Sequence, residues 1–334
     1  MAYAVLKHWH VVAATVLMTS RPLLTEASVG PDCSYEYSMI SVTLFAELVK
    51  WLLSVCVYWR LSSANHSHAS LRMRDVLHFA IPAAIYFVNN IIMFLIIKRI
   101  NSTHFQILSC LHTVFTALLF RAILCRVLSV TKWAAIVTLA CGAASYQIQQ
   151  TCAVGPHDEY GSGVELSNAE AMVCVVGTAL SSLLSSFAGV YSELLLKKDA
   201  QLHSIHLQNA MLYSWGLVFN SVSLAVFDGG NICNNGLLYG YNAWTWALLV
   251  NNAVTGLTIS AVLKYTNNIV CVFAHTGAMV ITASIAVLFL DAHTTLQLPL
   301  AIMIVTASTV IYAVDGPLKP NPTARVFLER QRAS

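Results

Sequence analysis

The chain has 334 residues, of which 57% are hydrophobic and only 10% are charged, and its formal net charge is +3. A soluble domain carries about a quarter charged residues, and a single core in a chain of this length could not bury so much apolar surface. The composition therefore excludes an ordinary soluble protein, and the small net charge offers no basis for binding nucleic acid. We expect an all-α protein of the lipid bilayer.

Ten stretches of the chain are long and apolar enough to form transmembrane helices. In chain order they are 6–24, 38–60, 76–97, 102–123, 130–149, 171–193, 206–227, 243–263, 268–290 and 296–314. A helix of about 20 residues crosses the roughly 30 Å hydrocarbon core, and these runs are too long and continuous for barrel strands. Arg21 interrupts the first stretch, for which a signal peptide is the alternative reading.

The charges in the connections predict the orientation of the chain. The connections 25–37, 150–168, 229–242 and 291–295 contain neither Lys nor Arg, whereas the alternate connections and the C-terminal tail contain several. Because positive charge stays on the cytosolic side, we expect both termini in the cytosol. Cys33, Cys152 and Cys233 fall in the non-cytosolic connections, where a disulfide is one reading and unpaired, small apolar residues are the favoured one.

A weak internal repeat relates the two halves of the sequence. Residues 118–146 and 284–312 both read as a helix, a short link and a second helix that ends in Tyr. We predict two five-helix repeats at 1–150 and 168–316, a luminal connection at 151–167 and a cytosolic tail at 317–334. Since five is odd, the second repeat enters the membrane from the opposite side, and inverted repeats of this kind are typical of transporters.

Several ionisable residues lie inside or near the ends of the predicted spans. Glu47 and Lys50 are three residues apart, so they share a helix face and can neutralise each other as a structural ion pair. Glu193 and Lys264 lie close to span ends, where they could be structural or gating groups. His112 lies deeper, and a lone histidine among apolar residues is more often a hydrogen-bonded structural group than a ligand.

Uncharged polar residues cluster in three of the spans. They are Tyr86, Asn89 and Asn90 in the third, Asn209 and Tyr213 in the seventh, and Asn251 and Ser260 in the eighth. Amides and tyrosines can bind a base, a ribose or a sugar hydroxyl, but the same residue types form hydrogen bonds between helices. The sequence has no phosphate-binding loop, no G-x-S-x-G motif and no His-Glu zinc motif, so we expect neither an enzyme nor a cofactor or metal site.

Short motifs follow one another along the chain, beginning with Ala46-Glu47-Leu48-Val49-Lys50 and Gly189-Val190-Tyr191-Ser192-Glu193. With these motifs the chain resembles the nucleotide-sugar transporters of the drug/metabolite transporter superfamily over about residues 10–315. Residues 46–50 resemble the acidic-x-x-lysine signature of that family, and residues 189–193 resemble its Gly-Val-Tyr-x-Glu motif. Further matches follow in family order at 208–209, 236–241, 251–257 and 264–269. The resemblance is closest to the CMP-sialic acid and UDP-galactose transporters, especially the plant-type members.

This resemblance implies an antiporter of the Golgi membrane that exchanges a nucleotide-sugar for its nucleoside monophosphate by alternating access. It also implies ten spans with cytosolic termini, and a homodimer is an assembly that the sequence leaves open. The implied substrate-binding positions are Tyr86, Asn89 and Asn90 for the pyrimidine, Ser185, Asn209, Tyr213 and Ser260 for the rest of the nucleotide, and Asn251, Phe105 and Gln106, with Phe105 replacing the tyrosine of a Tyr-Gln pair.

Two positions depart from the family pattern. Where the family places lysines that meet the phosphates, this chain has His112 and Cys271. A pyrophosphate needs cationic partners in a cavity of low dielectric, although an adjacent anion could raise the pKa of His112. Three readings follow: a pyrimidine nucleotide-sugar transporter with altered phosphate contacts, an exporter of another small metabolite, or a non-transporting Golgi scaffold or binding protein.

Overall fold

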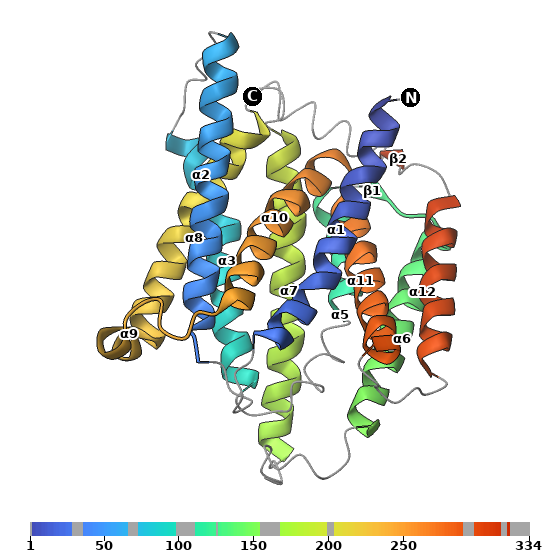
Figure 1. Cartoon of the computed structure of the whole chain (residues 1–334). Helices are drawn as coiled ribbons and strands as arrows, with labels where there is room; N and C mark the ends of the chain where they lie inside the picture. Colours follow the sequence, from blue (N-terminus) through green and yellow to red (C-terminus); the bar gives the residue numbers. More distant parts are fainter. Residues whose placement is uncertain are drawn as a thin grey trace. The chain divides into compact units, whose positions relative to one another are not determined.

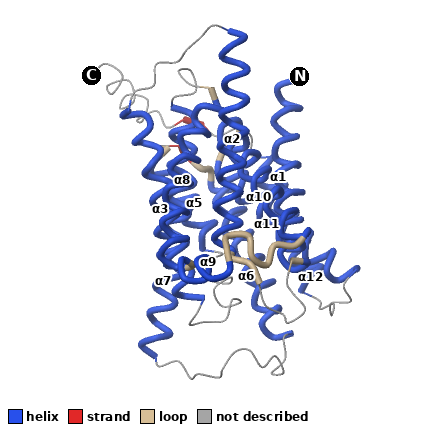
Figure 2. The backbone as a smooth tube through the Cα atoms, turned by 60° about the vertical axis from the view of Figure 1, so that its left-hand side comes forward, coloured by secondary structure: helices blue, strands red, loops and turns tan. Residues whose placement is uncertain are grey.

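A computed structural model describes residues 2–28, 36–65, 73–97, 111–124, 126–153, 168–198, 204–289, 297–314 and 319–320. The described chain is helical apart from one pair of two-residue strands, as the colouring of Figure 2 shows. Its elements are α1 (Ala2–Ala27), α2 (Met39–Asn65), α3 (Met73–Ile97), α5 (Leu111–Ile123), β1 (Arg126–Val127), α6 (Val130–Ala153), α7 (Asn168–Lys198), α8 (Ile205–Phe227), α9 (Gly229–Asn235), α10 (Ala243–Tyr265), α11 (Asn268–Phe289), α12 (Gln297–Val314) and β2 (Lys319–Pro320). The all-helical fold class is confirmed.

Each of the ten predicted spans overlaps one of these helices, although residues 102–110 of the fourth lie outside the described part. Among the described residues, four segments are long and apolar enough to cross a membrane: Met39–Leu61, Val175–Lys197, Ile205–Phe227 and Ala243–Tyr265. Shorter apolar helices cover His112–Ile123, Val130–Gly142, Asn268–Thr282 and Ile302–Tyr312. The protein is therefore a multi-pass membrane protein with several apolar helices.

Large apolar side chains are exposed in helical stripes, as expected where lipid replaces water. On α8, Val218, Val222 and Val226 recur every four residues and are 51%, 47% and 69% exposed. The spacing of four residues places them on one face of the helix. A stripe of this kind would be costly in water, and lipid is its favourable surrounding.

The described chain forms two compact units, each of which draws helices from both halves of the sequence. Unit 1 comprises Met1–Phe87 and Ser192–Thr282, and unit 2 comprises Val88–Tyr191 and Ala283–Ser334. These boundaries follow tertiary contacts, whereas the predicted repeats 1–150 and 168–316 concern internal symmetry. The repeats therefore remain a prediction.

In unit 1, α2 packs along α8 and α10, and α1 packs along α10, as Figure 1 shows. Polar contacts join α8 to α2 and to α3: the indole N–H of Trp51 donates to the Ser214 hydroxyl at 2.9 Å, and that of Trp215 donates to the carbonyl of Val76 on α3 at 2.9 Å. Two of the helices begin at clear caps. Ser204 accepts from the N–H of Leu207 at the start of α8, and Asn242 forms a capping box at the start of α10.

The connection between α9 and α10 packs closely on the segment before α2. Gly240 has φ +74°, and a side chain added there would lie 2.4 Å from the backbone of Glu36, so glycine is required for two reasons. Nearby, the hydroxyls of Ser41 and Tyr241 lie 2.8 Å apart, and Tyr37 and Val42 form a buried core with Leu248 and Leu249. This packing holds the ends of α2 and α10 together within unit 1.

In unit 2, α6 packs along α12 and against α5. Gly142 on α6 allows a close approach, because a Cβ there would lie 2.5 Å from the Ile304 side chain of α12. Near the start of α6, the Lys132 ammonium lies 5.3 Å from the centroid of the Tyr312 ring. The strands β1 and β2 pair in antiparallel fashion, Arg126 opposite Pro320.

Candidate functional site

The polar cluster of unit 1 is built around an ion pair on α2. The Lys50 ammonium lies 2.6 Å from the Glu47 carboxylate, and the two side chains are only 11% and 16% exposed. The pair is the one predicted from the i, i+3 spacing. Two glycines leave room for it, because a Cβ at Gly216 of α8 would lie 2.8 Å from Glu47 and a Cβ at Gly256 of α10 would lie 2.7 Å from Lys50.

Three predicted substrate-binding residues lie together beside this pair. The Ser260 hydroxyl on α10 donates to the amide oxygen of Asn209 on α8 at 2.5 Å, and both side chains are buried. Tyr213, one helical turn after Asn209, places its ring 4.5 Å from the Lys50 ammonium. An amide, a hydroxyl, a phenol and an ammonium group therefore meet where α2, α8 and α10 pack, and together they can offer donors and acceptors to a polar ligand.

A cavity of about 470 Å³ adjoins the cluster, again wholly within unit 1. Its walls come from α1, α2, α8 and α10, and the lining residues are His10, Leu53, Ser54, Val57, Ile205, His206, Asn209, Leu257, Ala261 and Tyr265. Asn209 belongs both to the cavity and to the cluster. At the cavity, the rings of His10 and Tyr265 stack with their centroids 5.5 Å apart.

Of the cavity residues, only Asn209 was predicted from the sequence. A spacing signal existed on α2, because Ser54 follows Glu47 by seven residues and Val57 follows Lys50 by seven, which places each pair on one side of the helix. His10, His206 and Tyr265 had no such signal. They come together through the packing of α1, α8 and α10, which the sequence does not reveal.

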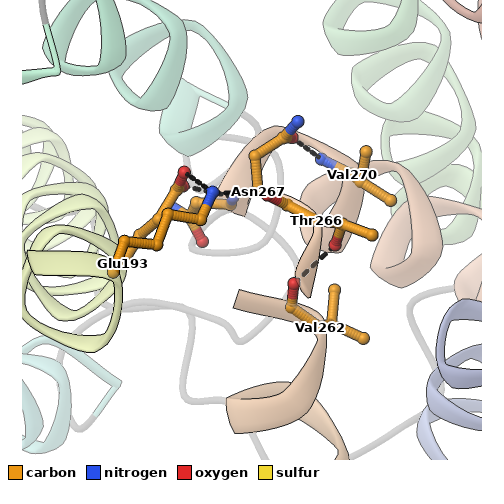
Figure 3. A network of polar contacts seen from close by, with 7 residues as sticks. Glu193, Val262, Thr266, Asn267 and Val270 are labelled. Carbon is orange, nitrogen blue, oxygen red and sulfur yellow. Dashed lines mark hydrogen bonds and ion pairs between the residues drawn. The ribbon is translucent and has the colours of Figure 1, made fainter. Parts of the chain in front are cut away.

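The Glu193 carboxylate organises the start of α11, as Figure 3 shows. Glu193 is fully buried and accepts two bonds of 2.6 Å, from the Lys197 ammonium and from the backbone N–H of Asn268, the first residue of α11. The Lys197 ammonium also donates to the carbonyl of Thr266. A carboxylate at a helix N-terminus is favoured by the exposed N–H groups and the helix dipole, so Glu193 fixes the α10–α11 connection to the end of α7.

Lys264 has a different environment from Lys50 and Lys197, the other lysines of unit 1 whose side chains are described. Its ammonium donates to the amide oxygen of the buried Gln208 at 2.9 Å, and it forms no ion pair with any described residue. Its positive charge lies close enough to His206, a lining residue of the cavity, to act on it electrostatically. Lys264 is therefore a cation held by a neutral amide at the edge of the cavity.

The remaining predicted residues of unit 1 occupy two other places. Tyr86 on α3 is 39% exposed and lies near Cys271 on α11, which is a free, half-buried cysteine. Asn251 instead joins α10 to α1, because it accepts from the Ser20 hydroxyl at 3.0 Å and donates to the carbonyl of Leu17 at 3.1 Å. For Asn251 the structure thus shows the helix–helix contact that the sequence left open as an alternative to cavity lining.

In unit 2, the predicted residues that are described lie on α3, α5 and α7. The Asn89 amide oxygen accepts from the Ser181 hydroxyl at 2.8 Å, and the carbonyl of His112 accepts from Ser186 at 3.0 Å. Ser185 is half-buried next to Ser186. Phe105, Gln106 and the side chain of Asn90 lie outside the described part of the chain, as do Cys33 and the side chain of Cys152, whereas Cys233 is a free, exposed cysteine.

Comparison with known proteins identifies the family. The sequence profile of the nucleotide-sugar transporter family matches residues 2–313. CMP-sialic acid transporter 1 of Oryza sativa subsp. japonica is 33% identical over 313 residues, which cover 91% of this chain and 94% of that protein. The UDP-N-acetylglucosamine transporter of Homo sapiens is 28% identical over 319 residues, with 92% and 94% covered.

A solved crystal structure shares the fold of most of the chain. It superposes with a TM-score of 0.67 at 12% sequence identity, covering 92% of this chain and 97% of the other. At that identity the likeness concerns the fold alone. The match of the family profile over almost the entire chain, together with relatives above 30% identity, establishes that this protein belongs to the nucleotide-sugar transporter family.

Proposed function

We propose that this protein is an antiporter that exchanges a pyrimidine nucleotide-sugar for the corresponding nucleoside monophosphate by alternating access. The observation that carries the proposal is the buried group of Asn209, Tyr213 and Ser260, whose side chains converge beside Lys50 in a chain of this family. Two relatives are named as transporters of CMP-sialic acid and of UDP-N-acetylglucosamine. Both of these nucleotide-sugars contain a pyrimidine base, which supports that class of base for the cargo.

The architecture that goes with this proposal has ten spans in two inverted five-helix repeats, at residues 1–150 and 168–316. The distribution of Lys and Arg favours cytosolic termini, with the connection 151–167 in the lumen and the tail 317–334 in the cytosol. We place the protein in the Golgi membrane. The nucleotide-sugar is loaded from the cytosol, and the monophosphate returns from the lumen.

In this proposal the residues have separate roles. Tyr86, Asn89 and Asn90 read the pyrimidine, whereas Asn209, Tyr213 and Ser260 hold the ribose and the phosphates. Amides and hydroxyls provide both donors and acceptors for these groups, and a tyrosine ring can stack on a base. His112 provides a titratable cationic partner, and Glu193 and the Glu47–Lys50 pair keep the helices in place.

The phosphates require positive charge, and Lys264 is the best-placed of the described lysines of unit 1. Lys50 and Lys197 are each paired with a carboxylate, whereas the Lys264 ammonium is held only by the neutral Gln208 amide. An anion near Lys264 would gain a charge-assisted hydrogen bond without first breaking an ion pair. We propose that Lys264 takes over part of the role of the two family lysines that are His112 and Cys271 here.

The replacement of those two lysines also favours a second candidate function, a non-transporting Golgi protein that binds or scaffolds other components. Thermal stabilisation by CMP, UMP, GMP and AMP separates the two, because a ligand at 100 times its Kd stabilises the folded state by about 2.7 kcal/mol. We expect the pyrimidine nucleotides to raise the Tm and the purine nucleotides to leave it unchanged. If none of the four nucleotides raises the Tm, the transport proposal fails.

A further inference from the structure

The cavity of unit 1 contains a buried hydroxyl that the fold leaves without a partner. Ser54 is only 1% exposed, and its hydroxyl forms no hydrogen bond with any described residue. Burial of an unpaired hydroxyl costs folding free energy, and such groups in native proteins commonly meet a ligand, an ion or water. Ser54 is also one of the residues that line the cavity, so a molecule inside the cavity would lie beside it.

The cavity has the size and surface of a small-molecule site. Its volume of about 470 Å³ falls in the range of about 300–1,000 Å³ that ligand pockets show. Leu53, Val57 and Leu257 provide apolar walls, while Ser54 and Asn209 provide polar groups. Ligand sites are typically apolar clefts with a few convergent polar groups, and this lining matches that description.

Charge in and around the cavity favours an anionic ligand. None of the lining residues is acidic, and His10 and His206 contribute imidazoles from two different helices. The Lys264 ammonium acts electrostatically on His206 and forms no ion pair within the described residues. An organic anion could therefore place its charged end near Lys264 and His206 and its uncharged part between the apolar walls.

Asn209 connects this cavity to the predicted binding residues, because its amide oxygen accepts from Ser260 while its side chain forms part of the cavity wall. We propose that the cavity receives the ribose of the cargo, with the phosphates toward Lys264 and His206, and that Ser54 hydrogen-bonds to a ribose hydroxyl. This inference rests on the proposed function, since it assumes that the cargo is a nucleotide. It adds a substrate contact on α2.

The test compares Ser54→Ala with the control Thr255→Val in the full-length purified protein. Thr255 on α10 is also a buried hydroxyl without a partner in the described residues, but it does not line the cavity. Removal of either hydroxyl should leave the Tm without ligand unchanged or higher. We expect Ser54→Ala to weaken the Kd for CMP or UMP by about threefold to tenfold, the equivalent of one hydrogen bond, and Thr255→Val to retain the wild-type Kd.

A second variant, Ala261→Phe, fills the cavity from α10 and should abolish nucleotide binding. If wild type is stabilised by a pyrimidine nucleotide and Ser54→Ala binds it equally well, this inference is wrong and the proposed function stands. If no nucleotide stabilises wild type, the proposed function and this inference are both wrong. A phospholipid found by native mass spectrometry in wild type but absent from Ala261→Phe would assign the cavity to lipid and also overturn the inference.

Discussion

Lys50 on α2 places its ammonium group 4.5 Å from the centroid of the Tyr213 ring on α8, while the same ammonium is paired with Glu47 at 2.6 Å. A cation over an aromatic face is stabilised by the ring quadrupole, most strongly when both are removed from water. The geometry links the ion pair of the family signature to a predicted nucleotide contact. Changes to the pair should therefore affect both stability and binding.

Glu47→Gln should destabilise the protein, because Lys50 would keep its charge in a largely buried position without its carboxylate partner. Removal of one partner of a buried pair costs about 3 kcal/mol. The double variant Glu47→Gln, Lys50→Met removes both charges and should recover most of that loss. Equilibrium unfolding in a denaturing detergent measures both variants.

Arg60→Gln provides the control for this experiment, since Arg60 is an exposed charge on the same helix. Its free energy of unfolding should change by less than about 0.5 kcal/mol. A Glu47→Gln variant as stable as Arg60→Gln would contradict the structural importance of the pair.

Gly216→Ala and Gly256→Ala should each destabilise the protein by about 1–3 kcal/mol, the usual cost of overpacking. The added methyl groups would lie 2.8 Å from the Glu47 carboxylate and 2.7 Å from the Lys50 side chain. Both side chains are held in the ion pair, so neither can move away without weakening it. Thermal unfolding followed by tryptophan fluorescence measures the effect.

Gly277→Ala is the matched control for both substitutions. Gly277 is also helical, but a Cβ there meets no atom within 4 Å. Because alanine is favoured over glycine in a helix by about 0.5–1 kcal/mol, this variant should be neutral or stabilised. Equal Tm values for Gly216→Ala and Gly277→Ala would show that the ion pair does not constrain α8.

Glu193→Gln should loosen the start of α11. The Lys197 ammonium and the Asn268 N–H bond to different oxygens of the carboxylate, so the glutamine keeps an acceptor for one donor and turns its NH2 group toward the other. Hydrogen bonds to a charged group contribute about 1.5–3 kcal/mol each, so we expect faster amide hydrogen exchange at residues 266–270, measured by mass spectrometry. Exchange at wild-type rates would exclude a role for Glu193 in fixing the α10–α11 connection.

Restoring the family lysines tests where the phosphates bind. His112→Lys and Cys271→Lys should each tighten the binding of a nucleoside diphosphate-sugar by about tenfold or more, because a charge-assisted hydrogen bond contributes about 1.5–3 kcal/mol. The neutral variants His112→Gln and Cys271→Ser control for the loss of the native side chains. Unchanged affinity in both lysine variants would contradict the assignment of these positions to the phosphates.

The helices could be predicted from the sequence because apolar runs of sufficient length have few alternatives in lipid. The short helix α9 was not predicted, since Gly229–Asn235 is only seven residues long and polar. The Glu47–Lys50 pair was predictable because a spacing of three residues places both side chains on the same face of one helix. By contrast, the bond from Asn268 to Glu193 joins residues 75 positions apart, and only helix packing brings them together.

The candidate site shows the same limit. Asn209 and Tyr213 share a face by spacing, but the Ser260 hydroxyl that meets Asn209 comes from another helix. Asn251 is an asparagine within a predicted span, as Asn209 is, yet it forms hydrogen bonds with residues of α1. Residue type cannot distinguish a helix–helix hydrogen bond from a ligand contact, because both use amides and hydroxyls.

The most direct test of the account is exchange in proteoliposomes. Purified protein is reconstituted with CMP or UMP inside the vesicles, and uptake of labelled CMP-, UDP- and GDP-sugars is measured with and without the internal nucleotide. The account predicts uptake of a CMP- or UDP-sugar that depends on the matching internal monophosphate. No exchange of any of these sugars by protein that unfolds cooperatively would contradict it.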